Sequence, residues 1–319
     1  MMILSIVFLL VVVEGVFSLS PHIPIRFETD QLLVIEKPTG IAHHDKTNRS
    51  ADDETDDTTI TNGVLTLLRQ QYPRLKGQLY GVHRLDQVTS GLLVVAKQPA
   101  MARCLTQAFT DRHVVKYYTG LSVRTPKKKK QGWVNGYMRR GRRKSWYLTK
   151  EKTIGEDGND SDDGALWAKS YFWTAGLGQL AEAYRGPKGQ EDPNMFTYPR
   201  TLILFRPYTG RTHQLRVASK SLGVPLLGDP LYATATTLED NTISKSFPRT
   251  CLHATGLHIP VEYLREGGLT EDLTLWSPPP FLAWWGSDNR PDVVRLLQKD
   301  SSIPDCLLEK ALNGSSMTM

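Results

Sequence analysis

The stretch GVHRLDQVTSGLLVVAK, residues 81–97, joins a group of ionisable side chains directly to a segment that must be buried. Residues 91–96 are almost wholly apolar, rich in Leu and Val, and bounded by Ser-Gly and Gln-Pro pairs, which is typical of a buried strand. Just before this strand lie His83, Arg84 and Asp86. An Asp in such a place often only caps a turn or pairs with a neighbouring Arg, so the stretch alone leaves its role open.

A second block, TGRTHQLR, combines charged side chains with a strand, a turn and a helix in the same way. It carries Arg211, His213, Gln214 and Arg216. If the two blocks meet in space, Asp86 faces a set of cations and stays ionised, because a neighbouring Arg favours the charged form of a carboxyl group. An ionised carboxylate suits a nucleophile or an electrostatic stabiliser, and it does not suit a general acid.

The positive charge of the chain is concentrated in one segment. The formal net charge is +6, which is compatible with polyanionic partners but decides little alone. Residues 124–150 contain many Lys and Arg residues and no acid, and an acidic run follows at residues 151–163. The basic segment 124–150 interleaves aromatic residues with its cations, as single-strand binders do: Trp133, Tyr137, Trp146 and Tyr147. A solvated surface hairpin is the alternative.

The cysteines argue against a metal site and against a disulfide framework. Cys104, Cys251 and Cys306 are isolated and odd in number, and no Cys or His spacing of a zinc site is present. We therefore expect no metal, no disulfide and a reducing compartment.

The N-terminal segment suggests targeting. Residues 1–13 are apolar, but a bilayer span takes about 20 residues. Small residues follow at Gly15, Ser18 and Ser20, which resembles a signal peptide that lacks the usual basic start. We expect residues 1–20 to be a targeting-like segment and the mature protein to have no membrane span; a buried N-terminal element is the alternative.

The remaining pattern predicts an α+β fold. Short amphipathic helices are expected near residues 63–72, 99–113 and 214–222, with a peripheral helix after Pro291. Strands are expected at residues 32–35, 91–96, 114–123, 167–174 and 201–205. Because the strands outnumber the helices and do not alternate with them, we expect a mainly antiparallel mixed sheet flanked by helices and loops.

Several long segments resemble the motifs of one enzyme family, in that family's order. HRLDQVTSGLLVVAK is similar to the signature of the RluA-like RNA pseudouridine synthases. The other motifs of that family are matched by LLVIEKPTGIAHH, VVKYYTGL, RPYTGRTHQLRVASKSLGVPLLGDPLY and LHATGL. The resemblance covers roughly residues 28–282.

The resemblance implies a reaction and a set of site residues. A uridine in RNA is detached at its N1–C1′ bond, turned over and rejoined through C5, with no metal or other cofactor. The catalytic residues implied are Asp86, Arg216, which pairs with it, and Tyr118, which stacks on the base and helps to remove the C5 proton. Arg84 matches a residue beside the flipped nucleotide. Further RNA contacts are expected from Lys116, Arg211 and His213, and from Arg139, Arg140, Arg142 and Arg143 of the basic segment.

Some residues depart from the family pattern or have two interpretations. Many members begin with a small RNA-binding domain, whereas about 27 residues precede the first motif here, so we expect the basic segment to supply phosphate contacts instead. Many members also have a histidine where this chain has Ala218. His83 is expected to be structural, because the mechanism needs no imidazole. Lys37 and Lys116 either touch phosphate or pair within the fold.

The expected organisation is a pseudouridine synthase domain at residues 24–285, with an insertion at about 124–165 and a peripheral C-terminal helix and tail at 286–319. We expect a monomer that acts on ribosomal RNA, transfer RNA or both. An inactive RNA-binding protein on the same fold is the main alternative. A retaining glycoside hydrolase would need a second carboxylate about 5–5.5 Å from the first, and Asp229 lies in a structural-looking turn. Localisation to a plastid or mitochondrion is favoured over the cytoplasm or nucleus.

Overall fold

The computed structural model describes residues 21–48, 59–75, 77–127, 129–151, 165–177, 201–233, 249–281 and 290–313. The expected targeting segment lies outside these residues, as do the acidic stretches 52–57 and 155–164.

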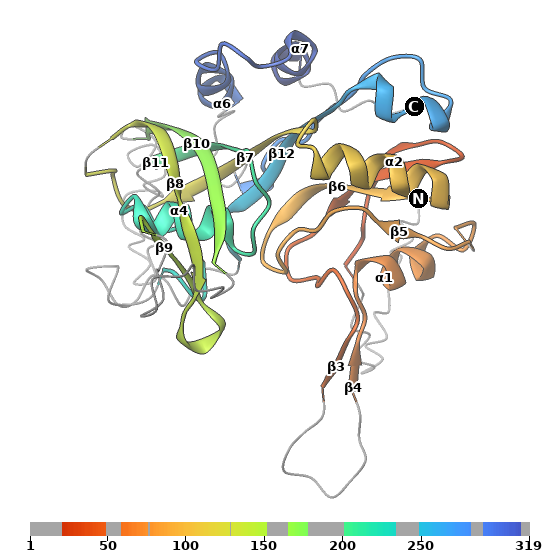
Figure 1. Ribbon diagram of the computed structural model, residues 1–319, viewed down its shortest axis with the longest axis horizontal. Helices are drawn as coiled ribbons and strands as arrows, with labels where there is room; N and C mark the ends of the chain where they lie inside the picture. The colour runs from red at the N-terminus through yellow and green to blue at the C-terminus, as the bar shows by residue number, and fades with distance from the viewer. Residues whose placement is uncertain are drawn as a thin grey trace, which may run out of the picture.

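One large mixed sheet forms the centre of the molecule (Figure 1). Its hydrogen-bonded order is β1 (Ile25–Glu28), β2 (Leu32–Lys37), β6 (Ser90–Ala96), β12 (Leu252–Ile259), β7 (Val115–Ser122), β11 (Thr201–Pro207), β10 (Leu166–Gly176), β8 (Gln131–Arg140) and β9 (Trp146–Thr149). The short strands β5 (Tyr80–Gly81) and β13 (Leu273–Trp276) add to β6 and β12. Within the described ranges, β6–β12 is the parallel pair of this sheet, and the other pairs are antiparallel. The α+β class with a mainly antiparallel sheet is confirmed.

The helices arise from amphipathic segments. They are α1 (Val64–Gln71), α2 (Pro99–Thr110), α4 (Gln214–Ser221), α6 (Arg290–Leu297) and α7 (Asp305–Asn313). Short 3-10 turns occur at Arg142–Lys144, Val261–Tyr263 and Arg265–Gly267. In α2, Pro99 occupies the first turn, where no backbone N–H is required, and the residues buried on one face are Met101, Leu105 and Ala108. The small hairpin of β3 (Lys46–Asn48) and β4 (Thr59–Thr61) projects from the body of the protein (Figure 1).

Opposite faces of the sheet contact different helices. Side chains alternate along a strand, so neighbouring residues of β11 point to opposite faces. Ile203 and Phe205 are buried in one cluster with Leu215 and Ala218 of α4. Leu202 and Leu204 are buried in another cluster with residues of α6 and α7. The helix α4 therefore lies on one face of this part of the sheet, and α6 and α7 lie on the other.

The C-terminal segment differs from the expectation of a single peripheral helix. It forms two helices, and Val293 and Leu297 of α6 and Leu307 and Ala311 of α7 are buried against the sheet. Their spacing along each helix places them on one face, which explains why both helices pack against the sheet instead of extending into solvent.

The basic segment becomes a hairpin at the edge of the sheet. Strands β8 and β9 pair from Tyr137–Thr149 to Arg140–Trp146, and the 3-10 turn at Arg142–Lys144 joins them. On its other side β8 pairs with β10. No helix in the described part of the chain is long and apolar enough to cross a membrane.

Candidate active site

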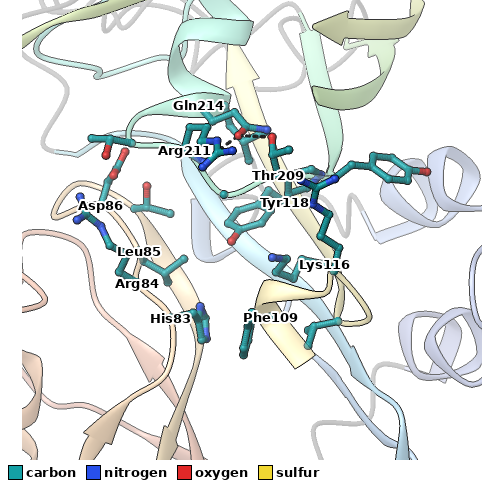
Figure 2. A pocket seen from close by; sticks show the side chains of 18 of the residues that line it. His83, Arg84, Leu85, Asp86, Phe109, Lys116, Tyr118, Thr209, Arg211 and Gln214 are labelled. Atoms are coloured by element: carbon teal, nitrogen blue, oxygen red, sulfur yellow. Dashed lines mark hydrogen bonds between the residues drawn. The ribbon is translucent and has the colours of Figure 1, made fainter. Parts of the chain in front are cut away.

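A cavity of about 560 Å³ lies where three segments of the sheet meet. The loop before β6 contributes residues 82–86, the start of β7 and the residue before it contribute residues 114–116 and Tyr118, and the link from β11 to α4 contributes residues 206–216. Figure 2 shows Asp86 and Arg84 on the first segment, with Tyr118 and Lys116 of β7 across from them. The two charged blocks of the sequence therefore meet, which is the condition under which Asp86 faces a set of cations.

Asp86 faces Arg216. The Nη1 atom of Arg216 donates to Oδ2 of Asp86 at 3.4 Å, and the side chains of Arg216 and Asp86 are only 3% and 17% exposed, respectively. The backbone supports the position of Asp86, because its carbonyl oxygen accepts a hydrogen bond from Thr89 N at 3.0 Å. Asp86 and Arg216, which the family resemblance implied to pair, are thus in contact.

Arg216 has a second and closer partner, Asp229. Its Nε and Nη2 atoms donate to the two carboxylate oxygens of Asp229 at 2.7 and 2.9 Å, and the Asp229 side chain is fully buried. Burial alone would lower the pKa of Arg216, but the bonded Asp229 and the nearby Asp86 outweigh it and raise that pKa. The guanidinium group therefore remains charged and held in place.

A tight turn presents Asp229. Its Oδ1 also accepts hydrogen bonds from the backbone N–H groups of Leu231 and Tyr232. Gly228 precedes it with φ +72°, and a Cβ atom there would lie 2.1 Å from the carbonyl oxygen of Arg249. The turn therefore requires glycine at this position. Asp229 is not free to act as a second catalytic carboxylate, which removes the geometric basis of the glycosidase alternative.

Tyr118 offers an aromatic ring within the cavity. It lies on β7, one residue from Tyr117, whose side chain points to the opposite face and donates to Asp300. Burial, with a smaller contribution from the charge of Asp86, raises the pKa of Tyr118 above its ordinary value. Its phenol is therefore neutral at physiological pH.

Lys116 lies on the same face of β7 as Tyr118, with Nζ 5.1 Å from the ring centre of Phe109. Burial lowers the pKa of Lys116 to about 8. The ring of Phe109 also stacks on His83, whose Nε2 accepts the backbone N–H of Val94 at 2.9 Å. His83 thus has the structural role expected of it, and burial lowers its pKa well below the usual range.

Lys37 pairs within the fold. Its side chain is fully buried, and Nζ donates to the backbone carbonyl groups of Pro38, Ile41 and Gln87 at 2.9, 3.0 and 3.3 Å. The last of these follows Asp86 directly in the chain. Lys37 therefore fixes the loop that carries Asp86, and of its two predicted roles the structure supports the internal one.

The start of α4 is shaped by Gln214. Its Oε1 atom accepts hydrogen bonds from Thr209 Oγ1 and Arg211 N, and its Nε2 donates to Ser170 Oγ (Figure 2). Arg211 lines the cavity, and its Nε donates to the carbonyl oxygen of Trp167 at 3.0 Å. Gln214 belongs to the TGRTHQLR block, but its role could not be inferred from the sequence.

His213 precedes α4 in a left-handed conformation, with φ 57°. Its Nδ1 lies 2.9 Å from the hydroxyl of Tyr232, which also accepts the backbone N–H of Trp146 on β9. Burial and the charge of Arg216 lower the pKa of His213, although Asp86 opposes this. The tyrosine of the GDPLY motif thus connects the cavity to the basic hairpin, a link that sequence reasoning missed.

The structure does not bring every predicted RNA contact into the cavity. Arg84, Lys116, Arg211 and His213 line it. The four arginines of the hairpin do not line it: Arg139, Arg140, Arg142 and Arg143. Among the residues that the structure describes, no group of three or more His, Cys, Asp or Glu side chains is arranged to hold a metal ion.

Comparisons with known proteins agree with this geometry. The family model of RNA pseudouridylate synthases matches residues 31–221. An uncharacterized RNA pseudouridine synthase of Haemophilus influenzae is 33% identical over 245 residues, which cover 77% of this chain and 84% of that protein. The ribosomal large subunit pseudouridine synthase C of Rickettsia prowazekii is 34% identical over 65% of this chain, which spans only 55% of that protein's length.

Two further similarities concern the RluA type and the fold. The dual-specificity RNA pseudouridine synthase RluA of Haemophilus ducreyi is 27% identical over 76% of this chain and 88% of its own length. The solved structure of human RNA Pseudouridylate Synthase Domain Containing 1 aligns with a TM-score of 0.56 and 24% identity, covering 83% of this chain and 86% of that one. The chain therefore belongs to the RluA-type family of RNA pseudouridine synthases.

Proposed function

We propose that this enzyme converts specific uridines of ribosomal or transfer RNA to pseudouridine, with the carboxylate of Asp86 as its key catalytic group. One observation carries the proposal. Asp86 is a partly exposed carboxylate that faces the cavity and is bonded to an arginine whose own charge is balanced by a second, buried carboxylate. This arrangement sets the Asp86 carboxylate beside a fixed guanidinium group whose positive charge is balanced by Asp229.

The chemistry explains why the carboxylate must be ionised. As the N1–C1′ bond stretches, C1′ becomes electron-poor, and a negative charge beside the sugar stabilises it. The requirement is the same whether Asp86 forms a bond to C1′ or accepts a proton, because both roles need a free lone pair on a carboxylate oxygen.

Tyr118 is proposed to receive the flipped base. Extruding a uridine from a helix costs a few kcal/mol, and stacking on an aromatic side chain returns about 1–3 kcal/mol. Because its phenol is neutral, we propose that Tyr118 assists removal of the C5 proton only as a neutral hydrogen-bonding group. Arg84, Lys116, Arg211 and His213 line the same cavity and are proposed to contact the nucleotide or its phosphates.

The choice of RNA rests on the relatives. One is described as acting on the large ribosomal subunit and another as having dual specificity. Mapping pseudouridine in total RNA with and without this gene tests the proposal. At least one pseudouridine should disappear, and the wild-type gene should restore it while Asp86→Asn should not. An unchanged map would favour the alternative of an inactive RNA-binding protein.

The location of the enzyme is a separate proposal. The targeting-like segment 1–20, with its apolar residues 1–13, and the isolated cysteines favour an organelle interior, such as that of a plastid or mitochondrion. A fluorescent fusion to residues 1–40 should mark an organelle. A diffuse cytoplasmic or nuclear signal would contradict targeting by this segment.

A further inference from the structure

One face of the sheet carries an open group of aromatic and cationic side chains. The register of the strands places them in rows. Trp133 of β8 lies opposite Tyr171 of β10, which lies opposite Arg206 of β11. In the next row, Lys169 of β10 lies beside Tyr208. The backbone N–H of Tyr208 donates a hydrogen bond to the carbonyl oxygen of Lys169. A third row pairs Tyr137 with Trp167.

The hairpin extends this face. Arg139 of β8 pairs with Tyr147 of β9, and alternation places both on the same side as Trp133 and Tyr137. The intervening residues point the other way, where Met138 and Ala168 are buried with Val217 of α4. Trp146 also packs on that side. The structure thus divides the aromatic residues of the basic segment, and we call the face with Trp133, Tyr137, Tyr147, Trp167, Lys169, Tyr171 and Tyr208 the open aromatic face.

Three rings of this face are exposed, and the ammonium group of Lys169 lies close to two of its rings. Trp133, Tyr147 and Trp167 are 44%, 47% and 40% exposed. The Nζ atom of Lys169 lies 4.1 Å from the ring centre of Trp133 and 5.7 Å from that of Tyr208. Large exposed rings are unusual on a soluble surface unless they have a partner.

The charge of this surface has one sign. Strands β8, β9, β10 and β11 contain no Asp or Glu, and their charged residues on this face are Arg139, Lys169 and Arg206, whereas Arg140 points to the other side with Trp146. Asp300, which accepts a hydrogen bond from Arg206, is buried and also bonded to Tyr117. An anionic partner that also offers flat apolar faces matches this combination.

The open aromatic face lies on the side of the sheet opposite Tyr118 and α4, and it reaches the active-site cavity at the edge formed by Arg206 and Tyr208. Arg206 and Tyr208 line the cavity, and the ring of Tyr208 lies 5.0 Å from that of Trp133. An RNA chain that leaves the cavity and passes around this edge at Tyr208 therefore meets Lys169 and Trp133 next.

We propose that the open aromatic face binds the single-stranded RNA that flanks the target uridine, with bases stacked on Trp133, Tyr147 and Trp167 and phosphates beside Lys169 and Arg139. The inference rests on the proposed function and names the part of the substrate that lies outside the cavity. Unpaired bases expose their faces for stacking, whereas a duplex hides them, and sheets that bind single-stranded RNA use exposed rings in this way.

Fluorescence anisotropy with a labelled oligouridylate of about 12 nucleotides tests the proposal. Trp133→Ala and Trp167→Ala should each weaken binding about fivefold to 100-fold, the reduction expected for one stacked base. Trp133→Phe should retain most of the affinity, since it keeps an aromatic ring. Lys169→Gln should reduce the slope of log affinity against log salt by about 0.7, the value for one neutralised phosphate on a single strand.

Matched controls come from the same protein. Leu166 is the neighbour of Trp167 on β10, is 46% exposed and points to the opposite face, and Leu312 of α7 is 50% exposed. Leu166→Ala and Leu312→Ala should bind the oligouridylate like the wild type. A fully paired RNA of the same length should bind the tryptophan variants and the wild type equally.

Three results would overturn the inference. They are unchanged oligouridylate affinity in both tryptophan variants, an equal loss of affinity in the leucine controls, or an equal loss of affinity for paired RNA. Unchanged affinity would instead assign the exposed rings to a protein partner. The inference and the proposed function can fail separately: a tryptophan variant that binds normally refutes the former, whereas a wild-type enzyme that binds the oligouridylate but forms no pseudouridine in any RNA refutes the latter.

Discussion

Asp229 holds the guanidinium group of Arg216 through both of its carboxylate oxygens, at 2.7 and 2.9 Å. The contact of Arg216 with Asp86 is longer, at 3.4 Å, and involves a single nitrogen. Arg216 is therefore anchored by a residue that has no direct part in the proposed chemistry. This division leaves Asp86 free to approach the sugar while its positive neighbour stays in place.

Removing the anchor should destabilise the protein. Asp229→Ala leaves a buried arginine with one distant partner, and breaking a buried ion pair from one side costs about 3–5 kcal/mol. The free energy of unfolding, measured by urea denaturation, should fall by that amount. Arg295→Ala is the control, because its ion pair with Asp292 is exposed and worth at most about 1 kcal/mol. Equal decreases in the two variants would contradict the anchoring role.

Tyr118 should separate binding from turnover. Tyr118→Phe keeps the ring and removes the hydroxyl, so RNA affinity should stay within about twofold, while turnover should fall about 100-fold or more if the hydroxyl assists proton transfer. Tyr118→Leu should also bind RNA more weakly, because the stacking surface is gone. Single-turnover rates and binding constants on one RNA measure both effects. Wild-type turnover in Tyr118→Phe would show that only the ring is used.

Lys37 should make the free energy of unfolding increase with pH above pH 7. Burial lowers the pKa of Lys37 to about 7, although the Asp86 carboxylate opposes this shift. Above pH 7 the unfolded chain keeps the proton that the folded protein releases, so stability rises with pH until the unfolded lysine also titrates. The wild type should gain about 2 kcal/mol over Lys37→Met between pH 7 and pH 9.

The control for this measurement is Lys299→Met, at an exposed position. Its difference in stability from the wild type should not change over the same pH range. Other groups that titrate there are common to all three proteins and cancel in the difference. A constant difference between wild type and Lys37→Met would contradict a titration of Lys37 in this range.

The hairpin arginines should set the salt dependence of RNA binding. Replacing Arg139, Arg140, Arg142 and Arg143 by Gln should flatten the slope of log affinity against log salt by about 0.7 for each phosphate that these side chains neutralise. Arg103→Gln and Arg265→Gln, at exposed positions outside the hairpin, should leave the slope unchanged. If the hairpin variant keeps the wild-type slope, these arginines belong to a solvated surface only.

The sequence was most informative where a local pattern determines the structure. The apolar run at residues 91–96 and the turn before α4 predicted a strand and a helix at the places where β6 and α4 lie. The resemblance of the same motifs to the RluA-like family implied that Asp86 and Arg216 pair. By contrast, β5 is two residues long and forms only because β6 offers an edge beside it. The parallel pairing of β6 with β12 depends on residues more than 150 positions apart, and no local pattern encodes it.

The roles of the supporting residues were beyond sequence reasoning for a similar reason. The GDPLY turn was expected to be structural, and it is. That its Asp229 anchors Arg216 could not be predicted, because this contact forms only in the folded protein. The basic segment showed aromatic residues among cations, and only the strand register separates Trp133 and Tyr147 from Trp146. The packing of the two C-terminal helices likewise could not be predicted, because it depends on the face of the sheet that they cover.

The most direct test of the account is the activity of Asp86→Asn on an RNA that the wild-type enzyme modifies. Asparagine is nearly isosteric with aspartate, so the folded structure and RNA affinity should be retained while the negative charge is removed. The account predicts that the purified variant binds the RNA within about threefold of the wild type, a smaller change than the removal of one stacked base causes, and forms no detectable pseudouridine. Conversion at a rate near that of the wild type would contradict the assignment of Asp86 as the catalytic carboxylate.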